Sequence, residues 1–103
     1  MNLQVEVKRN EQECFVKIIG EIDAYTAPGL KSELVPIAEK KGVQLTLDLS
    51  SVSYIDSTGL GVLVGTLKLT RKNDGSMRLI GLNERVSRLF KITGLNEIMD
   101  IRG

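Results

Sequence analysis

A strand must give way to a helix within a few residues in the middle of this chain, and this junction constrains the fold more than any other feature. Residues 43–49 alternate apolar and polar side chains, which is the period of a half-buried strand. The apolar residues downstream recur instead at helical spacing: Leu60, Leu63, Val64 and Leu67. We therefore predict a strand over 43–49 and a helix over 58–72.

The polar residues between these two elements fall at the N-terminus of the predicted helix. Backbone N–H groups there have no partner inside the helix, and the helix dipole favours a negative charge. Ser57 and Thr58 place two hydroxyl groups at this position, directly after Asp56. A serine here is either a helix cap or an acceptor for a phosphate group, and Asp56 is a second candidate for the cap.

Composition excludes several functional classes. The chain has 103 residues, enough for one domain, and its 42% hydrophobic content allows a core without disulfides or a metal. Its 14 basic and 13 acidic residues give a net charge of +1, so no basic surface for nucleic acid or a membrane is expected. Histidine is absent, which excludes a Ser-His-Asp triad and argues against a zinc site. We expect neither a metal nor a cofactor.

The single cysteine and the N-terminal residues bear on location. Cys14 has no second cysteine to pair with, and it falls in an apolar run that predicts a core position. A chain with one thiol fits a reducing compartment. The first residues show no signal peptide, and no apolar run approaches the length of a membrane span. We expect a cytoplasmic protein.

The first half of the chain predicts a hairpin followed by a helix. Residues 3–20 contain two strand-like runs separated by a polar turn. Thr26 is the expected N-cap of the next helix, and Pro28 suits its first turn because an N–H group needs no partner there. Pro36 should kink or break this helix, and Gly42 should end it.

The second half, after the central helix, predicts three further elements. Residues 77–80 form a short strand, and residues 83–92 form a helix. The side chains that this helix should bury are Val86, Leu89 and Phe90. Gly94 should end the helix, and Ile98 and Ile101 suggest a last short strand.

The predicted elements define the fold class. Their order is ββαβαβαβ, which is typical of an α/β fold with a small mixed sheet and helices packed on it. We see no internal repeat, linker or low-complexity segment that would divide the chain. We therefore expect one domain over residues 1–103.

Three glycines fall within the central helix: Gly59, Gly61 and Gly65. Each glycine inside a helix costs about 1 kcal/mol relative to alanine, so each needs a reason. Their spacing, G-x-G-x-x-x-G, differs from the dinucleotide fingerprint G-x-G-x-x-G, and they lie within the helix instead of before it. Two reasons stay open: close packing on the sheet, or a flat outer face, flanked by Val62, Thr66 and Leu69, on which a partner docks.

Four carboxylates could meet at strand ends or loops: Glu21, Asp23, Asp48 and Asp56. Paired carboxylates can perform acid–base catalysis or hold Mg²⁺, although capping and solvation explain each of them singly. Ser57 has no histidine as a base, and Lys68 and Lys72 lie too far along the helix to serve. Hydrolysis by Ser57 is therefore disfavoured, whereas its phosphorylation needs only exposure and a partner kinase.

Four short motifs, taken together, resemble the STAS domain. They are GEID (20–23), LDLS (47–50), YIDSTGLG (54–61) and ITGL (92–95). The resemblance runs over essentially the whole chain, from about residue 3 to 101. More narrowly, the chain is similar to bacterial anti-sigma factor antagonists, and most of all to the RsbV type of the general stress response.

This resemblance implies a partner switch in place of catalysis. In the family, an unphosphorylated antagonist binds an anti-sigma factor that is also a serine kinase of the GHKL type, and a sigma factor is freed. Phosphorylation at the position of Ser57, or alternatively Thr58, ends the binding, and a PP2C-type phosphatase reverses it. The partner contacts that the resemblance implies are Glu21, Asp23, Asp56, Ser57, Thr58, Gly59, Gly61 and Val62.

Other functions stay open beside the partner switch. A STAS module that binds a nucleotide or another small ligand would use the smooth face beside Gly61 and Gly65. A scaffold subunit of a larger signalling complex is a further alternative. An enzyme built on Asp23 and Asp56 is the least favoured hypothesis. We expect the free protein to be a monomer.

Overall fold

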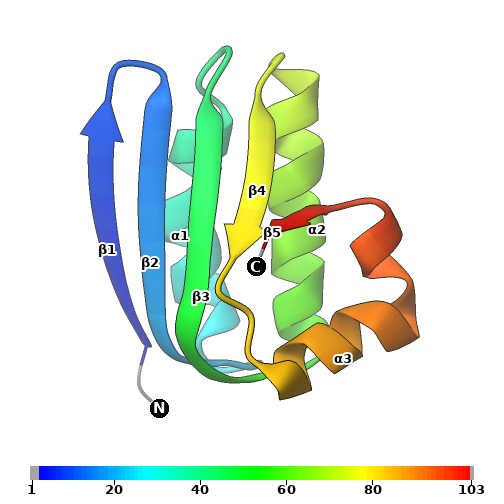
Figure 1. The fold of residues 1–103 in the computed structure, drawn as a ribbon. Helices are drawn as coiled ribbons and strands as arrows, with labels where there is room; N and C mark the ends of the chain where they lie inside the picture. Colours follow the sequence, from blue (N-terminus) through cyan, green and yellow to red (C-terminus); the bar gives the residue numbers. More distant parts are fainter. Residues whose placement is uncertain (1–2, 103) are drawn as a thin grey trace.

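The structure is a computed structural model that describes residues 3–102, and within them one sheet carries helices on one face (Figure 1). The elements, in chain order, are β1 (Leu3–Asn10), β2 (Glu13–Ile22), α1 (Ala27–Ala38), β3 (Gln44–Ile55), α2 (Ser57–Lys72), β4 (Ser76–Ile80), α3 (Glu84–Thr93), the short 3₁₀ helix η1 (Leu95–Glu97) and β5 (Asp100–Arg102). The predicted order ββαβαβαβ and the α/β class are confirmed, and η1 is an addition.

The order of strands in the sheet follows the order in the chain, β1-β2-β3-β4-β5. β1 is antiparallel to β2, and all later neighbours are parallel. Parallel neighbours require crossovers, which are right-handed in nearly all proteins. Because each new strand is added at the same edge of the sheet, right-handed crossovers place the connecting helices on the same face of the sheet. Figure 1 shows α1 and α2 behind the sheet, while the face toward the viewer carries no helix of residues 3–102.

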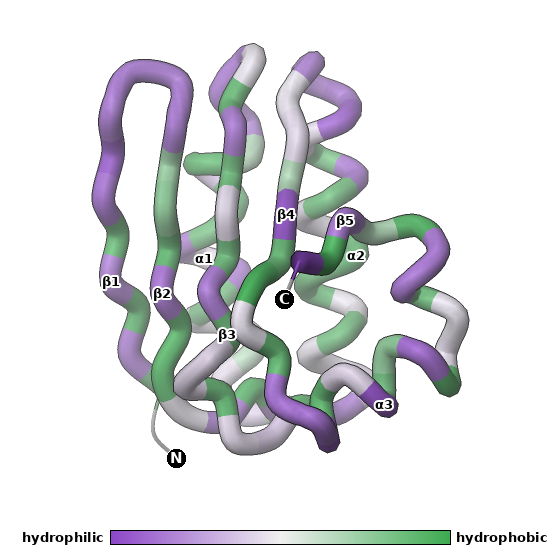
Figure 2. Tube along the Cα trace, in the orientation of Figure 1, coloured by the Kyte–Doolittle hydropathy of each residue, from purple (hydrophilic) through white to green (hydrophobic). Residues whose placement is uncertain are grey.

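The core lies between the sheet and these helices. Strand residues that are fully buried include Val16, Ile18, Leu45, Leu47, Leu49 and Leu79, and helix residues include Leu30, Leu34, Ile37, Leu63 and Phe90. Burying each such side chain contributes about 1.5–3 kcal/mol. Polar residues gather in the turn between β1 and β2, which is purple in Figure 2. Cys14 is buried, as predicted.

β3 is longer than predicted, and its extra residues position the candidate site. The predicted strand stopped at residue 49, whereas β3 continues to Ile55. From residue 49 onward the buried residues are Leu49, Val52 and Ile55, which are spaced by three positions instead of two. The cause is a pair of register shifts against β2, which interrupt the regular alternation. β3 thus ends directly at the start of α2.

The first helix begins where the sequence predicted, with Thr26 at the N-cap position, but it ends before Gly42. Pro36 does not break α1, because it lies in the last turn and the helix continues to Ala38. Pro28 lies in the first turn, as predicted. Thr26 precedes the helix, but its side chain makes no capping hydrogen bond to it. Gly42 lies beyond the end of α1, in the turn into β3, with a φ of 74° that favours glycine.

The third helix agrees with the sequence in most respects. Val86 and Phe90 are buried, but Leu89 is only half-buried, so the prediction that α3 buries all three is wrong for Leu89. Gly94 ends the helix in the left-handed region, with a φ of 77°. Ile101 lies in β5, whereas Ile98 lies before it and is exposed.

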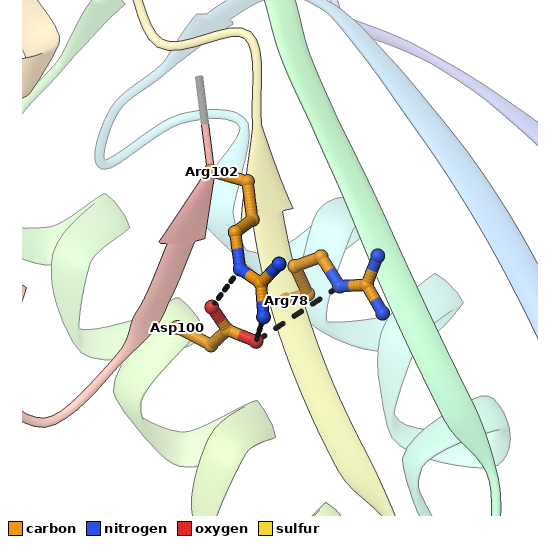
Figure 3. Close-up of polar contacts among 3 residues, drawn as sticks. All are labelled: Arg78, Asp100 and Arg102. Carbon is orange, nitrogen blue, oxygen red and sulfur yellow. Dashed lines mark hydrogen bonds and ion pairs between the residues drawn. The ribbon is translucent and has the colours of Figure 1, made fainter.

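β5 is a strand of three residues that pairs with β4, and charged side chains accompany this pairing. The Nε atom of Arg102 lies 2.7 Å from Oδ1 of Asp100, and Nε of Arg78 lies 3.9 Å from Oδ2 of Asp100 (Figure 3). All three side chains are about half exposed or more, so these ion pairs add little to stability.

Candidate functional site

The candidate site is built where β2 and β3 end side by side. Ile22 pairs with Ile55 in the last step of the parallel ladder, and the loops that follow them lead into α1 and α2. The backbone N–H of Asp56 donates to the carbonyl of Ile22 at 3.2 Å. This bond ties the β3–α2 junction to the β2–α1 loop, so the motifs GEID and YIDSTGLG form one end of the molecule.

Asp56 caps α2. Its backbone is extended, and its Oδ1 accepts a hydrogen bond from the N–H of Gly59 at 3.1 Å. Ser57 is therefore the first residue of the helix and not its cap. Ser57 is exposed, and its hydroxyl makes no hydrogen bond to any residue within 3–102. The structure decides between the two candidates for the cap in favour of Asp56 and leaves the serine hydroxyl free.

Gly59 is a packing glycine. A Cβ atom at this position would lie 2.6 Å from Cγ2 of Ile22, 2.9 Å from the carbonyl oxygen of Ile22 and 2.8 Å from Cγ1 of Ile55. Contacts this short with backbone cannot be relieved by rotating a side chain. The absence of a side chain at Gly59 thus lets the first turn of α2 lie directly on the ends of β2 and β3.

Gly61 and Gly65 are glycines of another kind. A Cβ atom at either position would meet nothing within 4 Å. Packing inside the protein therefore does not explain them, although each lowers the stability of the helix by about 1 kcal/mol relative to alanine. Both line a groove between α1 and α2. The alternative of close packing on the sheet is excluded for these two residues and holds for Gly59 alone.

The groove between α1 and α2 has a volume of about 400 Å³ and is mainly apolar. Its lining residues are Lys31, Val35, Thr58, Gly61, Val62, Gly65, Thr66 and Leu69. Thr58 is exposed and Val62 is half-buried. Thr66 departs from the expected outer face, because it is buried and its hydroxyl donates to the carbonyl of Val62 at 2.8 Å. We call this surface the glycine groove.

The β2–α1 loop is held by hydrogen bonds of Asp23 and Thr26. Oδ1 of Asp23 accepts from the N–H groups of Tyr25 at 2.9 Å and Thr26 at 3.0 Å. The Thr26 hydroxyl donates to the carbonyl of Glu21 at 2.8 Å and accepts from the N–H of Asp23 at 2.9 Å. The Thr26 N–H, with help from that of Tyr25, lowers the pKa of Asp23 because both stabilise the carboxylate. Asp23 is therefore ionised at neutral pH and shapes the loop.

The four carboxylates considered for catalysis do not come together as a group. Asp48 lies within β3, where its Oδ1 accepts from the N–H of Ser50 at 2.9 Å, away from the junction with α2. Glu21 is exposed at the end of β2 and pairs in register with Tyr54. In both Asp23 and Asp56, one carboxylate oxygen already accepts hydrogen bonds from backbone N–H groups. Over residues 3–102, no three Asp, Glu, Cys or His side chains gather as a metal site would require.

Sequence reasoning missed the contribution of α1 and of β3. Lys31 and Val35 form the second wall of the glycine groove, and only the packing of α1 against α2 places them there. Tyr54 is 44% exposed beside the junction, although it lies in a strand. The apolar stripe of Leu30, Leu34, Ile37 and Ala38 predicted the helix but gave no sign of which second helix it would face.

The comparisons with known proteins agree with this geometry. The family model for the STAS domain matches residues 4–103. The chain belongs to the STAS family. In this STAS protein the described part of the chain, 3–102, includes no helix that is both long and apolar enough to cross a membrane.

The curated relatives that this chain resembles are named anti-sigma-B factor antagonists. The chain is 55% identical to the anti-sigma-B factor antagonist of Bacillus subtilis over 101 residues, covering 98% of this chain and 92% of the relative. It is 47% identical to the antagonist of the same name from Listeria monocytogenes, covering 99% and 90%. Among solved structures, an anti-sigma factor antagonist from Mycobacterium paratuberculosis superposes with a TM-score of 0.86 at 26% identity, covering 97% of this chain and 85% of that one.

Proposed function

We propose that this STAS protein is an anti-sigma factor antagonist that works as a phosphorylation switch. Without phosphate it binds an anti-sigma factor, which is also a serine kinase of the GHKL type, and a sigma factor is released. Phosphorylation of Ser57 ends this binding, and a PP2C-type phosphatase restores it. The observation that carries the proposal is the free, exposed hydroxyl of Ser57 next to the glycine groove, where internal packing does not account for Gly61 and Gly65.

The glycine groove supports a protein partner. Gly61 and Gly65 lower helix stability without improving any internal contact, so the benefit must lie outside the chain. Glycines at this spacing expose the helix backbone and let another chain approach it closely. Val62 and Leu69 supply apolar surface along the same groove. A partner that lies here also covers the start of α2, where Thr58 lines the groove.

The electrostatics at Ser57 support a switch. A phosphate adds about −1.5 to −2 charges at neutral pH. Inside the free protein this charge lies at the N-terminus of α2, whose first turn holds no acidic residue, so the helix dipole stabilises it. Against a partner the same group must lose water, next to the carboxylate of Asp56. A loss of about 3–4 kcal/mol in the free energy of binding to the partner would weaken the affinity by roughly 10²–10³-fold.

The partner surface in this proposal has two parts. The first is the junction itself, with Asp56, Ser57, Thr58 and the packing residue Gly59, extended along α2 by Gly61 and Val62. The second is the β2–α1 loop, where Glu21 is exposed and Asp23 fixes the backbone. The hydrogen bond between Asp56 and Ile22 holds both parts in one relative position. The chain acts as a cytoplasmic regulator with no catalytic residue of its own.

Replacing Ser57 tests the switch directly. Purified anti-sigma-B kinase is titrated with the wild-type protein and with Ser57→Ala and Ser57→Asp, in the presence of ATP analogue so that no phosphate is transferred. We expect Ser57→Ala to bind like the wild type and Ser57→Asp to bind at least about 10-fold more weakly, since a single negative charge imitates only part of a phosphate. Mass spectrometry after incubation with ATP identifies the modified residue.

Two controls make the outcome specific. Ser76→Asp adds the same charge on an exposed serine at the start of β4, on a different strand from the junction, and should leave binding unchanged. Thr58→Ala tests the neighbouring hydroxyl, and phosphate should still be found on Ser57. Equal binding of Ser57→Asp and the wild type, or phosphate confined to Thr58, would contradict the proposed switch.

A further inference from the structure

The outer side of β1 has no partner in the sheet. β1 pairs with β2 on one side, and within residues 3–102 no strand pairs with its other side. In Figure 1 this side of β1 faces away from the rest of the molecule. The strand has eight residues, each of them half-buried or exposed, and it contains no proline. Its outward N–H and carbonyl groups can therefore pair with another strand.

The two faces of β1 carry different side chains. Val5 and Val7 are opposite two buried residues of β2, so they lie on the face of the sheet that carries the helices. Val7 is nevertheless 37% exposed. Glu6 and Lys8 lie on the other face, because side chains alternate along a strand, and both are exposed. Neither charge forms an ion pair within the part of the chain that the structure describes.

The order of these charges fits a second copy of β1 that runs antiparallel to the first. Alternate residues of an edge strand point their N–H and carbonyl groups outward, so two copies pair only where the residue numbers at opposite positions add up to an even number. With Val7 opposite Val7 of the second copy, Glu6 lies opposite Lys8 at two symmetric positions. A shift of one strand by two residues places Glu6 opposite Glu6 or Lys8 opposite Lys8 instead. Charge therefore selects the register centred on Val7, although charges on an edge commonly prevent pairing.

The charges inside the sheet extend this match. Glu6, Lys17 and Asp48 lie opposite one another on β1, β2 and β3, and their charges alternate in sign. This row ends at the outer edge of β1 with the negative charge of Glu6. Lys8 of a second copy would supply the next positive charge of the same row. Opposite charges at directly opposed positions stabilise a sheet, whereas like charges destabilise it.

The helix side of the same register offers a second ionic contact. Val5 lines a groove of about 360 Å³ between β1 and α1, and Glu33 of α1 lines it too. In the register centred on Val7, Arg9 of the second copy lies opposite Val5, next to this groove. Arg9 and Glu33 are exposed, and neither forms an ion pair within residues 3–102. Complementary charges on both faces of β1 thus require one and the same alignment.

We propose that this protein forms a symmetric dimer through β1, in which two five-stranded sheets join into one continuous sheet. The pairing is antiparallel and brings the two exposed Val7 side chains together. The dimer takes the place of the monomer expected from the sequence. No residue of β1 lines the glycine groove, so both copies keep that surface free. The inference therefore does not depend on the proposed function.

Exchanging the two charges tests the register. Sedimentation equilibrium over a range of concentrations gives the Kd of the dimer for the wild type, Lys8→Glu, Glu6→Lys and the double variant Glu6→Lys with Lys8→Glu. Each single variant places like charges opposite each other at two positions, so we expect its Kd to rise by about 10-fold or more. The double variant restores both pairs of opposite charge, and its Kd should return to within about threefold of the wild-type value. High salt should reduce these differences.

Two controls and a second readout locate the contact. Lys68→Glu makes the same change of charge on an exposed residue of α2 and should leave the Kd unchanged. Lys8 lies opposite the uncharged Phe15 in its own molecule, so Lys8→Glu should unfold in urea like the wild type at concentrations where both are monomers. In NMR spectra, alternate amide protons of β1 should exchange more slowly with solvent at high than at low protein concentration.

Three outcomes would overturn the inference. The first is a wild type that stays monomeric up to about 1 mM. The second is a dimer whose Kd is the same for the wild type and Lys8→Glu. The third is a double variant that dimerises as weakly as the single variants, since the charges would then not set the register. None of these outcomes bears on the switch at Ser57, which is tested separately by binding to the kinase.

Discussion

Among single residues, Gly59 and Gly61 lie on one helix yet have opposite physical roles. Gly59→Ala forces a Cβ atom to within 2.9 Å of the Ile22 carbonyl, so we expect a loss of about 1–3 kcal/mol in the free energy of unfolding. Gly61→Ala meets nothing within 4 Å and should instead gain roughly 1 kcal/mol through helix propensity. Urea unfolding of the two variants measures both changes.

Binding distinguishes the roles further. Gly61→Ala should weaken binding to the anti-sigma-B kinase although it stabilises the free protein, because the added methyl group fills the floor of the glycine groove. Lys68→Ala, on an exposed part of the same helix outside the groove, is a matched control that should bind normally. Unchanged kinase affinity in Gly61→Ala would show that the groove is not the docking surface.

The sequence predicted the residues of the junction better than their roles. The helical period after Leu60 placed Ser57 and Thr58 at a helix start, and the structure confirms this placement. The choice between Asp56 and Ser57 as cap depends on the local backbone conformation, since Asp56 is extended and its carboxylate reaches the Gly59 N–H. Residue types alone named both candidates but did not choose between them. The roles of the glycines were also not predictable from the sequence, because their neighbours come from other elements. Gly59 lies against Ile22 of β2, and Gly61 and Gly65 line a groove with residues of α1.

Among the elements, the β2–α1 loop holds a carboxylate, Asp23, whose ionisation stabilises the folded protein. Folding lowers the pKa of Asp23, chiefly through the Thr26 N–H, so the ionised form stabilises the folded protein. This contribution is complete above the unfolded pKa of about 3.9 and is lost as the pH falls through the lower folded value. We expect Asp23→Asn to be less stable than the wild type at pH 7 and the difference to shrink below about pH 4.

The comparison between variants is needed because Asp23 is not the only such group. The hydrogen bond from Arg102 also lowers the pKa of Asp100, so the wild type loses stability in acid for two reasons. Asp100→Asn is therefore the matched control, and it should keep the part of the pH dependence that comes from Asp23. Urea unfolding at pH 7 and pH 3 measures all three proteins. An equal deficit of Asp23→Asn at both pH values would contradict the assigned role.

Element types followed from the sequence, whereas element ends did not. Periodicity identified the longer strands and helices because burial on one face imposes it, whereas the three-residue η1 gave no such pattern. β3 exceeded its predicted end because two register shifts moved the buried positions to Leu49, Val52 and Ile55, and a period of three suggests no strand. Pro36 did not break α1. The carbonyl of Ser32, which Pro36 leaves without a helical donor, belongs to an exposed residue, so water can donate to it.

Over the whole molecule, topology places the candidate site and leaves one sheet face open. Parallel strands end together, so the loops after β2 and β3 must meet at one edge, and the sheet order β1-β2-β3-β4-β5 makes these two strands neighbours. One-directional crossovers put α1 beside α2, which creates the glycine groove. The sequence order of elements predicted the fold class, but neighbour relations between helices required the structure.

This arrangement predicts that phosphorylation acts locally and leaves the fold unchanged. The hydroxyl of Ser57 is exposed and has no hydrogen bond within residues 3–102 to lose, and the phosphate would lie at the N-terminus of α2, so the free protein should keep its midpoint of thermal unfolding within a few degrees. Amide chemical shifts in NMR spectra should change near residues 21–26 and 54–62 and stay constant in β1 and β4. Chemical-shift changes spread across the core would show instead that phosphorylation rearranges the fold. That rearrangement, and not local repulsion at Ser57, would then explain the loss of kinase binding.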